Sequence, residues 1–399
     1  MKPLASRLEQ IIPSASMAIA QRISDKTDTG RKTIDLTWGQ PDFDTFEHIK
    51  EAAFEAVRSG KNGYTNSSGI PELRQAISDF HASRYGAAYN PHAEIIVTPG
   101  VKQGLMYLIQ AMVDPGDEVV LFEPCWLSYR DMILLNGGIP RFIPAGGSLK
   151  PDVSGIEDFI NEKTKAILIN NPINPSGYVF SRSELEFIAE VAEKHDLYVI
   201  ADEIYDRIVF TGFTSLSVFQ NLRERLVVAN GFSKAYAMTG WRIGYLLGCE
   251  RILSKVSLIH QHTATCAAAA SQHAALAALK GDQRLIDEHV EIYRRRRDYL
   301  VEEFKESIFQ IVPPDGTFYA MIKVPDFLRN VTNKSEYVLE HYGIATVDGL
   351  SYGQSARDYV RISFAAGMDK LEEAVRRFKK SDKSASVERL SFSEIKKPH

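Results

Sequence analysis

The sequence predicts an α/β protein in which a large three-layer αβα domain with a mostly parallel sheet is accompanied by a smaller α+β domain. In the middle of the chain, short apolar segments alternate with amphipathic helical segments, a pattern typical of a parallel sheet covered by helices on both faces. Beyond about residue 282 the alternation gives way to one long charged helix and then to strand, helix and strand patterns.

The elements of the large domain follow in order along the chain. Apolar runs rich in β-branched residues predict strands at 94–100, 118–124, 165–172, 197–203 and 225–232. Helical periodicity predicts helices at 101–113, 125–137 and 181–196. The third helix has a clear start, because Ser181 and Glu184 have the spacing of a capping box.

The smaller domain is predicted to contain a helix at 287–307 and strands at 315–324 and 358–367, with a helix at 334–343 between the strands. The N-terminal residues lack the alternating pattern and are expected to pack against this unit. We therefore predict a large domain over 46–282, a small domain formed by 1–45 and 283–380, and a polar C-terminal tail over 381–399.

Composition argues against several classes of protein. The net charge of the 399-residue chain is −4, so there is no basic excess of the kind that nucleic-acid binding requires. No apolar run reaches the ~20 residues that a membrane-spanning helix needs, and the N-terminus lacks the core of a signal peptide. The three cysteines have neither metal-ligand nor disulfide spacing, so we expect no metal site and a cytoplasmic location.

Four polar segments follow predicted strands, at the edge where parallel sheets bind ligands. The Gly turn at 98–104 opens a helix whose free backbone N–H groups suit a phosphate, and the proline-rich loop at 170–177 could present Asn171 or Asn174. Asp202 follows a buried strand, where a carboxylate is costly unless it is paired. Lys234 follows another strand, where desolvation can leave a nucleophilic amine. Taken singly, each segment could equally be an ordinary turn, a surface strand end or an exposed lysine.

Taken together, the four segments supply what one cofactor needs. They offer a phosphate site, an amine that can form a Schiff base, a carboxylate for a pyridine nitrogen, and tyrosine and asparagine side chains for a phenolate oxygen. That cofactor is pyridoxal 5′-phosphate (PLP).

The segment SKAYAMTGWRIGY (233–245) resembles the lysine signature of the class I aminotransferases, which are fold type I PLP enzymes, and is similar to that of bacterial aspartate aminotransferases. The likeness extends over nearly the whole chain, through GQPDFDT (39–45), GYTNSSGIPELR (63–74), NNPINPSG (170–177), DEIY (202–205) and VRISFA (360–365). It implies a PLP-dependent aminotransferase with a large PLP domain, a small domain built from both termini, and a homodimer.

The resemblance also implies a catalytic set. Lys234 corresponds to the lysine that forms the Schiff base with the cofactor and later moves the substrate proton. Asp202 corresponds to the carboxylate that keeps the pyridine nitrogen protonated. Tyr205 and Asn174 correspond to the pair that contacts the ring oxygen O3′.

Further cofactor contacts are implied around the phosphate, on the ring face and from the neighbouring subunit. They are Gly100, Val101, Lys102, Ser233 and Arg242 at the phosphate, Trp126 on the ring, and Tyr64 from the second subunit. For the substrate, the resemblance implies that Arg361 clamps the α-carboxylate with help from the backbone at Gly39. Asn174, Lys102 and Trp126 are the other implied substrate contacts.

The expected reaction transfers the amino group of an L-amino acid to a 2-oxo acid such as 2-oxoglutarate. Lys102, with Ser14 and Ser16, indicates an acidic, aspartate-like substrate. An aromatic, basic or specialised biosynthetic amino acid is the alternative substrate. A fold type I PLP lyase, which shares the first steps of the chemistry, is the alternative enzyme, and a non-catalytic ligand-binding descendant is a third reading.

Several positions depart from the pattern of the family and bear on the choice of substrate. They are Trp38, Gln40, Asp348, His260 and His262. Either they have drifted, or they shape the pocket for an amino acid other than aspartate; the two histidines are expected near the substrate rim.

Overall fold

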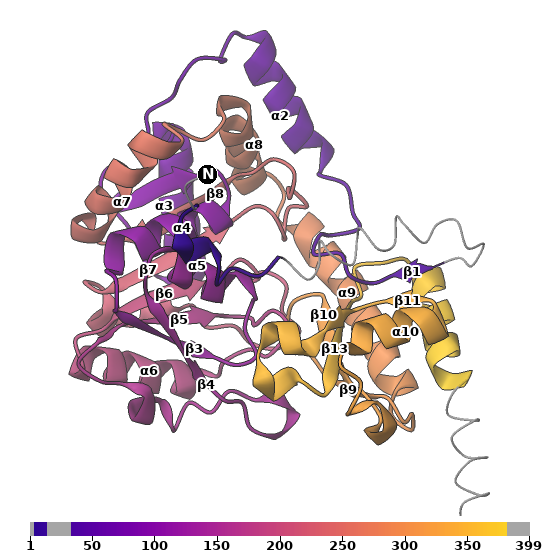
Figure 1. Ribbon diagram of the computed structural model, residues 1–399. Helices are drawn as coiled ribbons and strands as arrows, with labels where there is room; N and C mark the ends of the chain where they lie inside the picture. The colour runs from indigo at the N-terminus through magenta and orange to yellow at the C-terminus, as the bar shows by residue number, and fades with distance from the viewer. Residues whose placement is uncertain (1–3, 14–32, 381–399) are drawn as a thin grey trace, which may run out of the picture.

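The computed structural model describes residues 4–13 and 33–380, and the strands in these ranges form three sheets (Figure 1). The largest sheet has seven strands in the order β2-β8-β7-β6-β5-β3-β4. Their bounds are β2 Ile95–Thr98, β3 Glu118–Phe122, β4 Ile139–Ile143, β5 Thr164–Asn170, β6 Tyr198–Asp202, β7 Leu226–Gly231 and β8 Gly244–Gly248. Strand β8 alone runs in the direction opposite to the other six strands, so the prediction of a mostly parallel sheet is confirmed.

Helices cover both faces of this sheet, which explains why its central strands are apolar throughout. Side chains alternate between two cores: Leu168 and Ile200 belong to one, and Ile167 and Val199 to the other. The first core is closed by α4 (Val101–Met112), α5 (Ser128–Leu135) and α7 (Glu250–Thr263). The second is closed by α3 (Pro71–Tyr85), α6 (Arg182–Lys194) and α8 (Ala269–Lys280), and α2 (Glu47–Arg58) packs on α8.

The starts of α6 and α4 differ in a way that matters for function. At α6 the predicted capping box is present, because Ser181 accepts from the backbone N–H of Glu184 and the Glu184 side chain accepts from that of Ser181. At α4 the N-cap is Gly100, and no side chain caps the helix. The first N–H groups of α4 therefore remain available to a ligand.

The remaining elements form the smaller unit seen beside the large sheet in Figure 1. Four short strands make an antiparallel sheet in the order β12-β13-β10-β9: β12 Val347–Asp348, β13 Tyr359–Ser363, β10 Tyr319–Lys323 and β9 Gln310–Val312. The helices are α9 (Arg284–Glu303), α10 (Lys334–Tyr342) and a helical segment at 368–380.

One pairing joins the two ends of the chain. Strand β1 (Ile34–Asp35) runs parallel to β11 (Ile344–Ala345). This pairing places Ile34–Asp35 beside the segment 283–380, whereas the N-terminal turn at Ser6–Leu8 contacts α5 of the large unit, where Nη1 of Arg130 donates to the backbone oxygen of Gln10 at 3.2 Å. The boundaries at 46 and 282 remain a prediction, and the tail at 381–399 lies outside the described residues.

The strand ends converge on one edge of the large sheet. In register, Asn170 at the end of β5 lies opposite Asp202 at the end of β6, and Asp202 lies opposite Ala229 of β7. The loops that follow these strands therefore open at the same place. Within the described ranges, no helix is both long and apolar enough to cross a membrane.

Candidate active site

A cavity of about 570 Å³ opens at the carboxyl edge of the large sheet, where the smaller unit approaches it. Both units contribute to its walls, since the lining comes from the strand-end loops and from β10 and β13. The sequence-predicted residues that line it are Gly39, Val101, Lys102, Trp126, Asn174, Asp202, Tyr205, Ser233, Lys234, Arg242 and Arg361. Residues far apart in the sequence are thus brought together in one place.

Lys234 is the one amine of the cavity wall that lies beyond the end of β7. Its Nζ donates to the backbone oxygen of Gly39 at 2.5 Å. Burial, with the positive charges of Arg242 and Arg361, lowers the pKa of Lys234 to about 8, although Asp202 opposes the shift. The neutral, nucleophilic form of this amine is therefore much more populated near physiological pH than that of an ordinary lysine.

Asp202 ends β6 and is almost completely buried. The Tyr129 hydroxyl donates to Oδ2 of Asp202 at 2.7 Å, and the N–H of Ile204 donates to Oδ1 at 3.2 Å. Burial raises the pKa of Asp202 to about 6, while Tyr129, the Ile204 N–H and the charge of Lys234 lower it. A cationic partner in the cavity would therefore have an ionised carboxylate available at neutral pH.

An anion cradle forms where the N-terminus of α4 meets Arg242. Gly100 has φ +84°, and a Cβ at this position would lie 2.7 Å from Nη2 of Arg242. A Cβ on Gly244 would lie 2.7 Å from the backbone nitrogen of Val101. The positive φ favours glycine at position 100, and the close approach of β8 to the start of α4 favours glycine at position 244. Two positive elements facing one space are suited to a phosphate.

Arg361 lies on the side of the cavity that the smaller unit forms. Its Nη2 donates to the backbone oxygen of Thr37 at 2.8 Å, and its Nη1 donates to Oδ1 of Asn174 at 3.2 Å. The guanidinium carbon stands 4.3 Å from the ring centre of Tyr319, whose hydroxyl lies 3.2 Å from that of Tyr205. A planar guanidinium held from several sides is pre-organised to bind a carboxylate.

Lys102 and Trp126 lie together at another part of the wall. Nζ of Lys102 lies 5.1 Å from the centre of the Trp126 ring. Partial burial and the nearby charge of Arg242 lower the pKa of Lys102. Trp38 and Gln40, two of the positions that depart from the family pattern, also line the cavity and are exposed.

Several residues that the sequence analysis named do not line this cavity. Tyr64 is 90% exposed and is not part of the wall in this chain. His260 is fully buried on α7 against Tyr107, and neither it nor His262 lines the cavity, so the expectation of a place at its rim is corrected. Burial of the His260 ring against the α4 side of the core accounts for its position. Ser14 and Ser16 lie outside the described residues.

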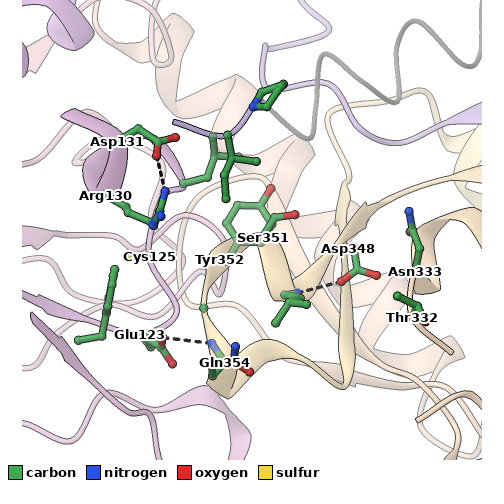
Figure 2. Close-up of a pocket in the computed structure, with 16 residues that line it drawn as sticks. Glu123, Cys125, Arg130, Asp131, Thr332, Asn333, Asp348, Ser351, Tyr352 and Gln354 are labelled. Carbon is green, nitrogen blue, oxygen red and sulfur yellow. Dashed lines mark hydrogen bonds and ion pairs between the residues drawn. The ribbon is translucent and has the colours of Figure 1, made fainter. Parts of the chain in front are cut away.

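Asp348 lines a second cavity, of about 630 Å³, whose wall also includes Cys125 and Arg130 (Figure 2). Its carboxylate accepts from the backbone N–H groups of Leu350 and Lys334, at 2.9 and 2.6 Å. The aspartate thus caps a short 3₁₀ turn and joins it to α10. Asp348 does not line the cavity that holds Lys234.

Three of the wall residues that the sequence analysis did not single out contact Asp202 or Tyr205. Tyr129 contacts Asp202, Tyr319 contacts Tyr205, and Asn170 donates to the backbone oxygen of Asp202 at 2.9 Å. Asn170 could have been found, because it ends a predicted strand next to Asp202. The two tyrosines carried no such signal, because each lies within an ordinary helical or strand pattern.

A cleft that combines a low-pKa amine, a buried carboxylate and two guanidiniums is that of an enzyme acting on amines and anions. The family model described as aminotransferase class I and II matches residues 31–378. The chain therefore belongs to the class I and II aminotransferase family, whose members are PLP-dependent transaminases.

Individual relatives agree with this assignment. The chain is 36% identical over 377 residues to the aspartate aminotransferase of Thermotoga maritima, covering 94% of this chain and 98% of that protein. It is 36% identical over 384 residues to the aspartate/prephenate aminotransferase of Thermus thermophilus, covering 95% and 98%. Among solved structures, the aspartate aminotransferase of Rhizobium meliloti superimposes with a TM-score of 0.91 at 33% identity, covering 96% and 99%.

The anion cradle yields a first prediction. Gly244→Ala places a methyl group against the backbone nitrogen of Val101, so the first turn of α4 must move away from Arg242. Overpacking of this kind costs typically about 1–3 kcal/mol. We therefore expect the affinity for PLP, measured by fluorescence quenching, to fall by roughly tenfold.

Gly212→Ala is the matched control, because a Cβ at Gly212 meets nothing within 4 Å. Thermal unfolding of the cofactor-free proteins shows whether either change disturbs the fold as a whole. Unchanged affinity in Gly244→Ala would mean that the close approach at Gly244 does not shape the ligand site.

Proposed function

We propose that the cavity binds PLP and that the protein transfers the α-amino group of an L-amino acid to a 2-oxo acid, with acidic substrates preferred. The observation that carries this proposal is the presence of Lys234 and Asp202 in one cavity with the cradle at Arg242. The chemical groups of PLP match the residues of this cavity. The cradle suits its phosphate, Asp202 its ring nitrogen, Lys234 its aldehyde carbon, and Trp126 its ring face.

The residues of the chain have separate tasks in this reaction. When bound, the cofactor supplies a protonated pyridine ring that takes up the electron pair left on the substrate Cα. Lys234 would bond to the aldehyde carbon of the cofactor in the absence of substrate and, as a free amine, would take the Cα proton of the substrate. Asp202 keeps a positive charge on the ring nitrogen. Arg361 binds the α-carboxylate and so fixes which Cα bond points toward Lys234.

The overall exchange balances without an oxidant or a reductant. One amino acid becomes a 2-oxo acid, and a second 2-oxo acid, such as 2-oxoglutarate, receives the amino group. Tyr205 and Asn174 are proposed to donate to O3′ of the cofactor, because both lie in the wall beside Lys234. Both residues also contact the smaller unit: Asn174 accepts a hydrogen bond from Arg361, and the Tyr205 hydroxyl is hydrogen-bonded to that of Tyr319.

The charge of the cavity supports an acidic substrate. Its wall carries Lys102, Lys234, Arg242 and Arg361 against the single carboxylate of Asp202. The cofactor and an α-carboxylate engage three of these cations and leave Lys102 for a side-chain carboxylate. The names of the relatives from Thermotoga maritima and Thermus thermophilus, which include aspartate, point the same way.

A specific observation keeps aromatic substrates as a second candidate. Trp38 is 54% exposed at the wall, and Trp126 lies in the same cavity, so aromatic surface is available to a ring. A solved aromatic aminotransferase from Pyrococcus horikoshii also superimposes on this chain, with a TM-score of 0.85 at 33% identity, covering 92% of this chain and 99% of that one.

A homodimer is proposed from the exposure of Tyr64. A tyrosine that is 90% exposed and outside the cavity of its own chain is available to the cavity of a second copy, where its hydroxyl would reach the cofactor phosphate. A cytoplasmic location is proposed from the free cysteines Cys125, Cys249 and Cys266.

The role of Lys234 is tested by Lys234→Ala. The variant should lose the visible absorbance that PLP acquires on bonding to an amine, and its turnover should fall by roughly 10³-fold or more, because one residue supplies both the nucleophile and the base. In the wild type, capture of added PLP by the cofactor-free protein should accelerate as the pH rises through about 8, because only the neutral amine reacts. Absorbance at wild-type level in Lys234→Ala would assign the amine to another lysine.

Substrate choice is tested by Lys102→Met, which keeps the length of the side chain and removes its charge. With aspartate as donor we expect kcat/KM to fall by about 10- to 100-fold, the range of a hydrogen bond between charged groups. With phenylalanine the change should stay within about threefold. Lys163→Met is the control, at an exposed lysine outside the cavity. Equal losses with both donors would remove Lys102 from side-chain recognition.

The shared site is tested by mixing Tyr64→Ala and Lys234→Ala, each of which is expected to be impaired on its own. In a mixed dimer, one cavity combines an intact Lys234 with an intact Tyr64 from the other copy. Activity should therefore exceed the sum of the two parents after the subunits exchange. If mass spectrometry demonstrates mixed dimers and activity does not recover, Tyr64 does not act in the cavity of the second copy.

A further inference from the structure

We propose that Tyr129 is a positioning residue of this site, whose hydroxyl holds the Asp202 carboxylate in the orientation and charge state that a pyridine nitrogen requires. The inference rests on the proposed function, and it assigns a task to a side chain that the PLP chemistry itself does not use.

The geometry around Asp202 assigns one fixed donor to each carboxylate oxygen. The hydroxyl of Tyr129, itself only 1% exposed, donates to Oδ2 at 2.7 Å, and the N–H of Ile204 donates to Oδ1 at 3.2 Å. The first donor comes from α5 and the second from the turn after β6. Two donors from separate elements fix the plane of the carboxylate, and each oxygen keeps a lone pair for the cavity, whose wall includes Asp202.

The short segment 125–131, which contains Tyr129, also carries Trp126, the aromatic side chain expected on the ring face of the cofactor. The rings of Trp126 and Tyr129 meet edge to face, with centroids 5.2 Å apart and an interplanar angle of 82°. The position of Trp126 and the position of Asp202 are thus linked through Tyr129. A bound cofactor ring would therefore contact Trp126 on its face and Asp202 at its nitrogen, with the relative position of these two side chains fixed by Tyr129.

The segment 125–131 lies between two cavities, and the hydrogen bond from Tyr129 to Asp202 is one of the contacts that anchor it. Trp126 and Tyr129 face the cavity described above, whereas Cys125, Arg130 and Asp131 line the second cavity shown in Figure 2. At its start the segment is also held by the backbone N–H of Cys125, which donates to the backbone oxygen of Tyr352 at 3.0 Å. The hydrogen bond to Asp202 ties it to the central sheet.

The charge state of Asp202 depends on its neighbours from three elements. Tyr129 faces it from α5, Lys234 from the segment after β7, and Glu203 and Tyr205 from its own strand end. Burial raises the pKa of Asp202, and the Tyr129 hydrogen bond is the largest influence that lowers it. Without this hydroxyl the pKa rises further, and the carboxyl becomes neutral over a range of pH in which the site needs its charge.

The sign of the effect on activity follows directly. Asp202 serves the ring nitrogen only above its own pKa. Loss of the Tyr129 hydroxyl therefore moves the acidic limb of the activity profile to higher pH and leaves the basic limb in place.

The test uses Tyr129→Phe with PLP labelled with ¹⁵N at the ring nitrogen. In the holoenzyme the ¹⁵N shift should change as the Asp202 carboxylate beside the ring nitrogen takes up a proton, and the midpoint of this change should lie about one pH unit higher in the variant than in the wild type. The affinity for PLP should fall by roughly tenfold. Because neither readout is turnover, a purely structural effect on catalysis does not imitate them.

Tyr85→Phe is the matched control. The Tyr85 hydroxyl donates to Oδ2 of Asp206 at 2.5 Å, so it too serves a buried aspartate of the same strand end, but outside the cavity. Its removal should lower the unfolding temperature of the cofactor-free protein as much as Tyr129→Phe does. The ¹⁵N midpoint and the PLP affinity should remain within experimental error of the wild type.

A double variant provides a second arm. In Asp202→Asn the charge is already absent, so adding Tyr129→Phe should weaken PLP binding by less than twofold, whereas independent effects would multiply. A ¹⁵N midpoint and affinity in Tyr129→Phe equal to those of the wild type would overturn the proposal. Failure of Tyr129→Phe to fold, with Tyr85→Phe folded, would also overturn it, because the role would then be structural. A wild type that binds no PLP would instead defeat the proposed function, and this inference with it.

Discussion

The structure depends on the burial of two opposite charges at one edge of the sheet. Water is kept from most of the surface of both groups, so burial raises the pKa of Asp202 to about 6 and lowers that of Lys234 to about 8. A pair of buried ionisable groups that do not touch each other costs stability. Such a cost is typical of a site in which a ligand completes the arrangement.

The other features of the site follow from the need to bring a ligand between these groups. Glycines at 100 and 244 allow the start of α4 to approach Arg242, and α4 leaves its first N–H groups without a side-chain cap. Arg361 and Tyr319 come from the smaller unit and meet Asn174 and Tyr205 from the large sheet. The site is therefore complete only when the two units are packed together, which couples the position of the substrate clamp to that of the groups expected at the cofactor.

Sequence patterns predicted the fold well because they record local physics. Apolar strands and amphipathic helices gave the layers, and the capping box at Ser181 gave the start of α6. Lys234 and Asp202 could be placed together because each follows a strand of one parallel sheet, whose carboxyl ends share an edge. Tyr129 could not be placed, since its hydroxyl meets Asp202 across 73 residues of sequence and nothing in the helical pattern marks it. The same reason explains the misplacement of His260, whose helix turns it into the core.

The most direct measurement of the central claim is chemical. The purified protein, incubated with PLP and reduced with borohydride, retains a phosphopyridoxyl group on whichever lysine formed the bond, and peptide mass spectrometry locates it. The account predicts one modified site per chain, at Lys234, and no such modification when Asp202 and Arg242 are both replaced. Modification at a different lysine, or none in the wild-type protein, would contradict it.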